Sequence, residues 1–156
     1  MPDVQHVAHA EPVWRERANY IIQVSLEGYG MQPGALEQLW TRTQDQQRFE
    51  VCCLPFFTYG IALGDEVTWT DGDRQAVVAS RSGRRLIRCA FDDPADGERS
   101  HEDFHGALVA SGALVEFLRP GYVAIDIDSP TRLSAVLEAI SPLHESGRAS
   151  WEWASE

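Results

Sequence analysis

Residues His101 to His105 match His-Glu-x-x-His, the pattern that zinc proteases carry on a helix. Two imidazoles one helical turn apart hold Zn²⁺, and the glutamate activates the bound water. Here a charged Asp103 occupies a middle position, and Ser100 with the early acids is typical of a helix start. No third ligand stands at a familiar spacing, although Glu116 and Glu138 are available. We expect a solvated first helical turn and neither metal nor cofactor, with His101 and His105 as the alternative metal ligands.

Two adjacent thiols, Cys52 and Cys53, are the next residues that could do chemistry. Neighbours on an expected strand point to opposite faces, and a disulfide between them would strain the peptide. A cysteine nucleophile needs a base, whereas the histidines at 101, 105 and 144 belong to the other half of the chain. We expect buried, unreactive thiols, and Cys52 rather than Cys53 as the nucleophile if either one is.

Aromatic residues concentrate between Phe49 and Trp69, where Gly60 and Gly64 supply turns. Phe56, Phe57, Tyr59 and Trp69 suit the core of a small barrel, and the same rings could line a pocket in which the Tyr59 hydroxyl anchors a ligand. Both interpretations stay open, because the mouth of a barrel uses the same residues.

The charge balance limits the partners. The chain of 156 residues has 24 acidic and 13 basic residues, a net charge of -11, and every basic residue is arginine. Such a protein repels phosphate backbones, so four arginines between Arg81 and Arg88 predict a solvated edge rather than a nucleic-acid site. Neither a secretory signal nor a long apolar run is present. We expect a cytoplasmic protein, monomeric or a small homo-oligomer, with no nucleic-acid or membrane partner.

The elements that must position these residues fall into two groups, and the expected fold class is α+β. Residues 1–17 lack periodicity and predict a flexible lead-in. Residues 18–83 predict a small β-barrel-like domain of short strands, with hairpins joining 36–43 to 48–54 and 66–70 to 75–80.

Residues 84–156 predict a ferredoxin-like domain with the order β-α-β-β-α-β. A first helix is expected at 101–112 and a second after Ser129, with Pro130 at its first position. Apolar residues spaced three and four apart predict one apolar face on the second helix, with Leu137 in the core. The face is formed by Leu133, Val136, Leu137 and Ile140.

Successive side chains of a strand point to opposite faces, so a set of charged residues is expected on the sheet face away from the helices. Ile87, Cys89, Val123, Ile125 and Trp151 are expected to face the helices, and Arg88, Glu116, Asp126 and Glu152 the other side. We expect Arg88 to pair with Asp126 across the sheet. If the barrel packs over this face, its aromatic turn, Phe56 to Tyr59, is expected to lie over or beside these charges. An inter-domain cleft with an apolar wall and a polar floor results, and Arg88 would anchor an anionic or carbonyl group there.

The run Pro55-Phe-Phe-Thr-Tyr-Gly-Ile-Ala-Leu-Gly-Asp65, followed by Ser82-Gly83 and an arginine-rich strand, resembles a bacterial family, the domain-of-unknown-function family 4265. The resemblance runs from about Leu39 to Trp153. It implies a recurring two-part bacterial protein and brings no catalytic residues with it.

Two functions compete. The first is a non-enzymatic binding or regulatory module that holds a small ligand or a protein at the inter-domain cleft or open sheet face. The alternative is an enzyme of specialised metabolism that modifies a small molecule in the same cleft. No catalytic residue is assigned. The candidate ligand-binding residues are Phe57, Tyr59, Asp65, Arg88, Glu116, Asp126 and Cys52.

Overall fold

Apolar and polar residues alternate along the first half of the chain, which favours strands. The computed structural model describes residues 5–156, a mixed α+β fold with two sheets and two helices. The first sheet runs in the order β1-β3-β4-β5-β6, and β2 also pairs with β3. Its strands are β1 (His6–Val7), β2 (Tyr20–Ser25), β3 (Leu36–Arg42), β4 (Arg48–Val51), β5 (Glu66–Thr68) and β6 (Val77–Ser80).

This sheet encloses an apolar cluster but does not close on itself. The two predicted hairpins are present, as antiparallel pairs β3–β4 and β5–β6. Within residues 5–156, no ladder joins β6 back to β1 or β2. The expectation of a barrel-like domain is therefore corrected to an open sheet. Its core contains Ile22, Val24, Leu39, Phe49, Val51, Cys53, Ile61 and Val67.

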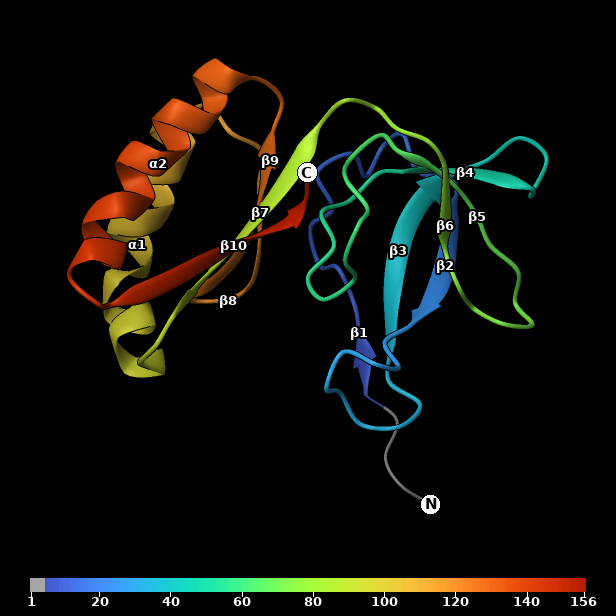
Figure 1. Ribbon diagram of the computed structural model, residues 1–156, viewed down its shortest axis with the longest axis horizontal. Helices are drawn as coiled ribbons and strands as arrows, with labels where there is room; N and C mark the ends of the chain where they lie inside the picture. The colour runs from blue at the N-terminus through green and yellow to red at the C-terminus, as the bar shows by residue number, and fades with distance from the viewer. Residues whose placement is uncertain (1–4) are drawn as a thin grey trace.

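The second half follows the predicted order of strands and helices. Its antiparallel sheet has the order β10-β7-β9-β8. Both helices lie on the side of this sheet that is remote from the first half (Figure 1). The elements are β7 (Arg85–Phe91), α1 (Pro94–Ala110), β8 (Val115–Arg119), β9 (Tyr122–Ile127), α2 (Pro130–Glu145) and β10 (Ala149–Ser155).

The start of α1 differs from the prediction. Asp93 is its N-cap and accepts a hydrogen bond from the Ala95 N–H, and Pro94 is the first helical residue. Ser100 is therefore not a cap, and His101 lies in the middle of the helix rather than in its first turn. The second helix starts as predicted, with the Ser129 side chain accepting from the Arg132 N–H.

Each face of the second sheet has its own core. The helix-facing cluster contains Ile87, Cys89, Val123 and Ile125, as predicted. Leu137 is an exception, because it is only half-buried and lies outside that cluster. On the other face, Leu86, Ala124 and Ala154 pack against Leu54, Phe56 and Leu63 of the first half. We call this interface the seam.

Residues 5–17 belong to the fold, which corrects the expectation of a flexible lead-in; residues 1–4 lie outside the described part of the chain. β1 pairs in parallel with β3, and the Trp14 N–H donates to the Cys52 carbonyl at 3.0 Å. His9 is buried. The segment has no sequence periodicity because its one strand, β1, is only two residues long and the rest is held by contacts with distant residues.

Candidate functional site

A charged cluster around Arg88 lies in the seam. The side chain leaves β7 on the face away from the helices and is only 3% exposed. One terminal nitrogen donates to the carbonyls of Thr58 at 3.0 Å and Pro55 at 3.3 Å. The guanidinium carbon lies 4.3 Å from the centre of the Tyr59 ring, so a cation–π contact covers it. The aromatic turn of the first half thus lies over Arg88, as the sequence predicted.

The Nε–H of Arg88 has no hydrogen-bond partner in the described structure. The Glu152 carboxylate on β10 lies 3.6 Å from this nitrogen and is 49% exposed. Glu152 instead accepts a hydrogen bond from the Tyr59 hydroxyl at 2.6 Å. That bond, together with burial, raises the pKa of Tyr59. Arg88, Tyr59 and Glu152 form the Arg88 cluster.

A hollow of about 240 Å³ opens beside this cluster, with Arg88, Tyr122 and Glu152 in its wall. The Tyr122 hydroxyl donates to the Phe56 carbonyl at 2.5 Å. Burial raises the pKa of Tyr122 to about 12, against the opposing charge of Arg88. Tyr122 is therefore a fixed neutral donor, and the wall carries one positive charge on Arg88 and one negative charge on Glu152.

A second cluster in the seam consists of His9, Glu37 and Glu116. The imidazole bridges the two halves, because its Nε2 lies 2.9 Å from Glu37 of β3 and its Nδ1 lies 2.8 Å from Glu116 of β8. Its ring is stacked on Phe56, with centroids 4.4 Å apart and planes inclined by 7°. All three polar side chains are buried. We call this set the His9 cluster.

The carboxylates of the His9 cluster are held by the backbone of residues 54–58. Glu37 accepts hydrogen bonds from the N–H groups of Phe56, Phe57 and Thr58 and from the Thr58 hydroxyl. Glu116 accepts from the N–H groups of Leu54 and Val13. Both carboxylates are therefore positioned without help from solvent, and a charge of the opposite sign between them is required.

Both ring nitrogens of His9 face a carboxylate, so both carry a proton. Burial opposes the charge, but the hydrogen bonds to Glu116 and Glu37 outweigh it and raise the pKa of His9 to about 9. Burial likewise opposes ionisation of Glu37, and the hydrogen bond and charge of His9 outweigh it, so the pKa of Glu37 is lowered. The cluster is an imidazolium between carboxylates.

The expected pair of Arg88 with Asp126 is wrong. Arg88 stands opposite Ala124 on β9, while Asp126 stands opposite Leu86 and pairs with Arg84 at 2.5 Å. Burial raises the pKa of Asp126 to about 6, although the charge of Arg84 opposes the shift. The strand face was predicted correctly, because a register change of two residues leaves a side chain on the same face.

The other predicted residues lie in different surroundings. Phe57 packs near Tyr122, with ring centres 5.5 Å apart. Asp65 is buried in its own loop, where it accepts from the N–H groups of Ala62 and Ser82. Neither residue lines the hollow beside Arg88.

The cysteines do not form a reactive site. Both Cys52 and Cys53 are buried, and they follow β4 rather than lying on a strand, so the expectation that they point to opposite faces of a strand is corrected. Burial, with the charge of Glu50, raises the pKa of Cys52 to about 11, and burial raises that of Cys53 well above its ordinary value. These thiols are protonated at neutral pH and do not line the hollow beside Arg88.

His101 and His105 are stacked on α1, with centroids 5.7 Å apart, and both contact Phe117. With Glu116 they line a hollow of about 250 Å³ beside the His9 cluster. In residues 5–156, no three His, Cys, Asp or Glu side chains are grouped as a metal site. The same part of the chain has no helix long and apolar enough to cross a membrane.

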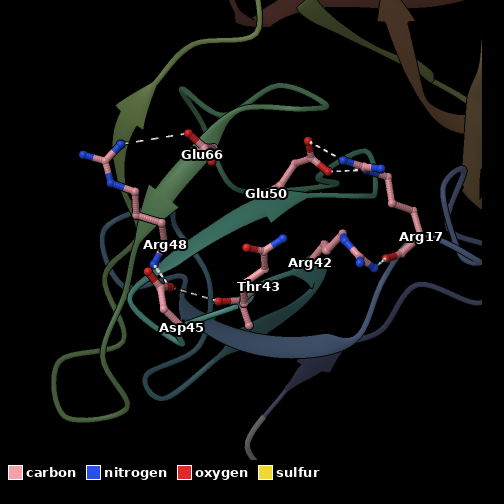
Figure 2. Close-up of a pocket in the computed structure, with 8 residues that line it drawn as sticks. Arg17, Arg42, Thr43, Asp45, Arg48, Glu50 and Glu66 are labelled. Carbon is pink, nitrogen blue, oxygen red and sulfur yellow. Dashed lines mark hydrogen bonds and ion pairs between the residues drawn. The ribbon is translucent and has the colours of Figure 1, made fainter.

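A hollow of about 270 Å³ lies away from the seam, at the β3–β4 hairpin. Figure 2 shows that its charged side chains face one another: Arg17 pairs with Glu50, and Arg48 lies 3.9 Å from Glu66. The side chain of Arg42 donates to the Arg17 carbonyl. Such exposed pairs contribute little to stability, and their charges already neutralise one another. We do not assign a site there.

Sequence reasoning missed His9, Glu37 and Tyr122. The partners of His9 lie 28 and 107 residues away in the sequence, so no local spacing reveals them. One signal was present for Glu37: it is an acid on strand β3, next to Leu36. A charge at such a position must be paired if it is buried.

These features define a class: an α+β protein in which two sheets meet at a seam that contains buried charges. The family described as Domain of unknown function (DUF4265) matches residues 37–151, and the chain belongs to it. Comparison with curated proteins finds no match. A similar fold occurs in a hypothetical protein from Neisseria gonorrhoeae, with a TM-score of 0.61 and 18% identity over 78% of this chain and 84% of that one.

Proposed function

We propose that this protein is a non-enzymatic binding module that holds a small anionic ligand against Arg88 in the hollow at the seam. The observation that carries the proposal is the buried guanidinium whose Nε–H lacks a hydrogen-bond partner among the described residues. A buried donor without an acceptor costs free energy, and for a charged group the cost is larger. An oxygen of a ligand would remove that cost.

A carboxylate fits this position best. Guanidinium groups bind planar carboxylates through charge-assisted hydrogen bonds. Tyr59 and Tyr122 add aromatic surface next to the charge, and Glu152 is exposed enough to move aside. The strand order β10-β7-β9-β8 supports the ferredoxin-like interpretation of residues 84–156, and the proposed ligand binds at the sheet face opposite the helices.

Binding is favoured over catalysis by the chemistry of the wall. A general base needs a pKa near neutrality, whereas Tyr122 titrates at about 12. The buried Asp126, with its pKa of about 6, does not line the hollow. The alternative, an enzyme using the same cleft, would require a ligand that brings its own reactive group.

The test is a titration of ¹⁵N-labelled protein with benzoate, acetate and inorganic phosphate. It is followed at the backbone amide resonances of β7 and β10 in every variant and, where Arg88 is present, at its Nε–H resonance. We expect a saturable shift, strongest with the carboxylates. Arg88→Lys should weaken binding by a factor of ~10 or more, since lysine cannot supply the planar donor pair.

Arg85→Lys is the matched control. Arg85 lies on the same strand and stacks on Trp153, 4.6 Å from the ring centre, so its loss should leave the affinity unchanged. Absence of saturation with all three probes, or an equal loss in the two variants, would contradict the proposal.

A further inference from the structure

The His9 cluster has the features of a ligand site that is already occupied. Two buried carboxylates face opposite edges of one flat ring, at 2.9 and 2.8 Å. Phe56 provides a stacking surface 4.4 Å from the ring centre. Backbone N–H groups hold Glu37 and Glu116 in place independently of the imidazole. Such an arrangement selects a planar cation with N–H donors on two edges.

The occupant and the site come from different parts of the chain. Glu37, Phe56 and Glu116 all fall within residues 37–151, the range that matches the family. His9 lies outside that range, on a segment that is joined to the rest by the short β1–β3 ladder, by a few hydrogen bonds and by the packing of Val7, Val13 and Trp14. The family region therefore builds the site, and the N-terminal segment supplies the cation.

The site also has a neighbouring space. The hollow of about 250 Å³ near α1 shares Phe56 and Glu116 with the His9 cluster, and Ala10 and Glu11 of the N-terminal segment complete its wall. Displacement of this segment would join the hollow to the position of the imidazole, so a ligand larger than imidazole would fit.

We propose that Glu37, Phe56 and Glu116 form a recognition site for planar cations, and that residues 5–17 are its resident occupant, which an imidazole-bearing ligand can replace. The segment then acts as an internal competitor at this site. The ligand is a small imidazolium compound or a peptide with a histidine, and the two sources share the same chemistry.

The first experiment is chemical rescue of full-length His9→Gly. This variant removes the occupant and leaves two buried carboxylates without a cation, so it should be much less stable than the wild type. Added imidazole should restore stability, shifting the unfolding equilibrium ~100-fold when its concentration reaches about 100 times its Kd. N-Methylimidazole, which keeps the ring but loses one N–H, should rescue less.

Two control variants isolate the site. His144→Gly removes an exposed histidine of α2 and should gain nothing from imidazole. His9→Gly combined with Glu116→Gln should lose the rescue. If His9→Gly is purified unfolded, refolding from urea with imidazole present gives the same answer. Failure of imidazole to stabilise or refold this variant would overturn the proposal.

The second experiment asks whether the occupant of the wild-type protein can be exchanged. Imidazole, or a peptide with the sequence of residues 5–17, should accelerate amide hydrogen exchange at Trp14, whose N–H is bonded to Cys52. Acceleration by imidazole alone indicates a small-molecule ligand, and acceleration by the peptide as well indicates a protein segment. Unchanged exchange with both would show a permanent structural histidine and overturn the proposal.

Discussion

The two charged clusters of the seam are built from the same parts and are completed differently. Each has a planar cation against an aromatic ring, with the loop after β4 above it. In the His9 cluster, both ring nitrogens are paired with buried carboxylates. In the Arg88 cluster, the nearest carboxylate is half-exposed and too distant for a hydrogen bond to Nε.

This difference gives the two clusters different roles: the His9 cluster stabilises the fold, and the Arg88 cluster leaves a position for a ligand. The His9 cluster joins β3 of the first half to β8 of the second, and its imidazolium is paired with two carboxylates away from water. A buried pair of this kind is costly to break, because the remaining partner is left as an uncompensated charge. The Arg88 cluster lies in the wall of a hollow, and its Nε–H has no acceptor among the described residues. The comparison predicts a graded set of effects.

The largest effect is expected from Glu37→Gln. The amide removes the charge that accepts these hydrogen bonds and turns an N–H donor toward the N–H groups of residues 56–58. Buried donors are then left unpaired, so we expect a loss of ~3–5 kcal/mol in unfolding free energy. Glu152→Gln, the same change in the half-exposed cluster, should cost under ~1 kcal/mol. Urea unfolding followed by circular dichroism measures both. Similar losses in the two variants would remove the distinction between the clusters.

The next effect is on the pH dependence of stability. The pKa of His9 is raised to about 9 from an ordinary value of 6.5, so its stabilising contribution is complete below pH 6.5 and is lost as the pH rises through 9. Thermal unfolding of the wild type should therefore shift downward over this range. His9→Gln should flatten the profile there, whereas Arg88→Lys should leave it intact. A wild-type profile that is flat between these values would contradict the imidazolium assignment.

Asp126 provides a smaller effect of the same sign at lower pH. Burial raises its pKa to about 6 from 3.8, so the folded state takes up a proton more readily than the unfolded chain. This group's contribution is therefore most favourable at low pH and decreases as the pH rises from 3.8 through 6. Asp126→Asn should remove that dependence. The measurement is the difference in unfolding free energy between variant and wild type across this interval, and a constant difference would show that Arg84 keeps the carboxyl ionised.

The smallest effect is expected from Tyr59→Phe. The ring that covers Arg88 stays, and only the hydrogen bond to the exposed Glu152 is lost, so stability should fall by ~0.5–1.5 kcal/mol at most. Tyr59→Ala also removes the ring and should lower the affinity for benzoate along with stability. If both variants bind benzoate like the wild type, the aromatic cover of Arg88 has no part in recognition.

Local pattern was sufficient for several features. The second helix begins after Ser129 because the serine side chain accepts a hydrogen bond from a free N–H of the first turn. Pro130 then fixes the backbone in a helical conformation at the first position. Alternation placed Arg88, Glu116 and Asp126 on the face away from the helices, since side chains of a strand point to opposite sides in turn. The aromatic turn was expected near Arg88, and Tyr59 does cover it.

What the sequence by itself determined was therefore the elements, their faces and the membership of a family, all of which depend on residues near one another in the chain. Only the tertiary structure decided the partners: Ala124 rather than Asp126 opposite Arg88, and His9 between Glu37 and Glu116. Pairing across a sheet depends on register, which faces alone do not fix when a change of two residues keeps every side chain on its side. The place of His9 depends on the path of an aperiodic segment, which is set by contacts with residues far along the chain.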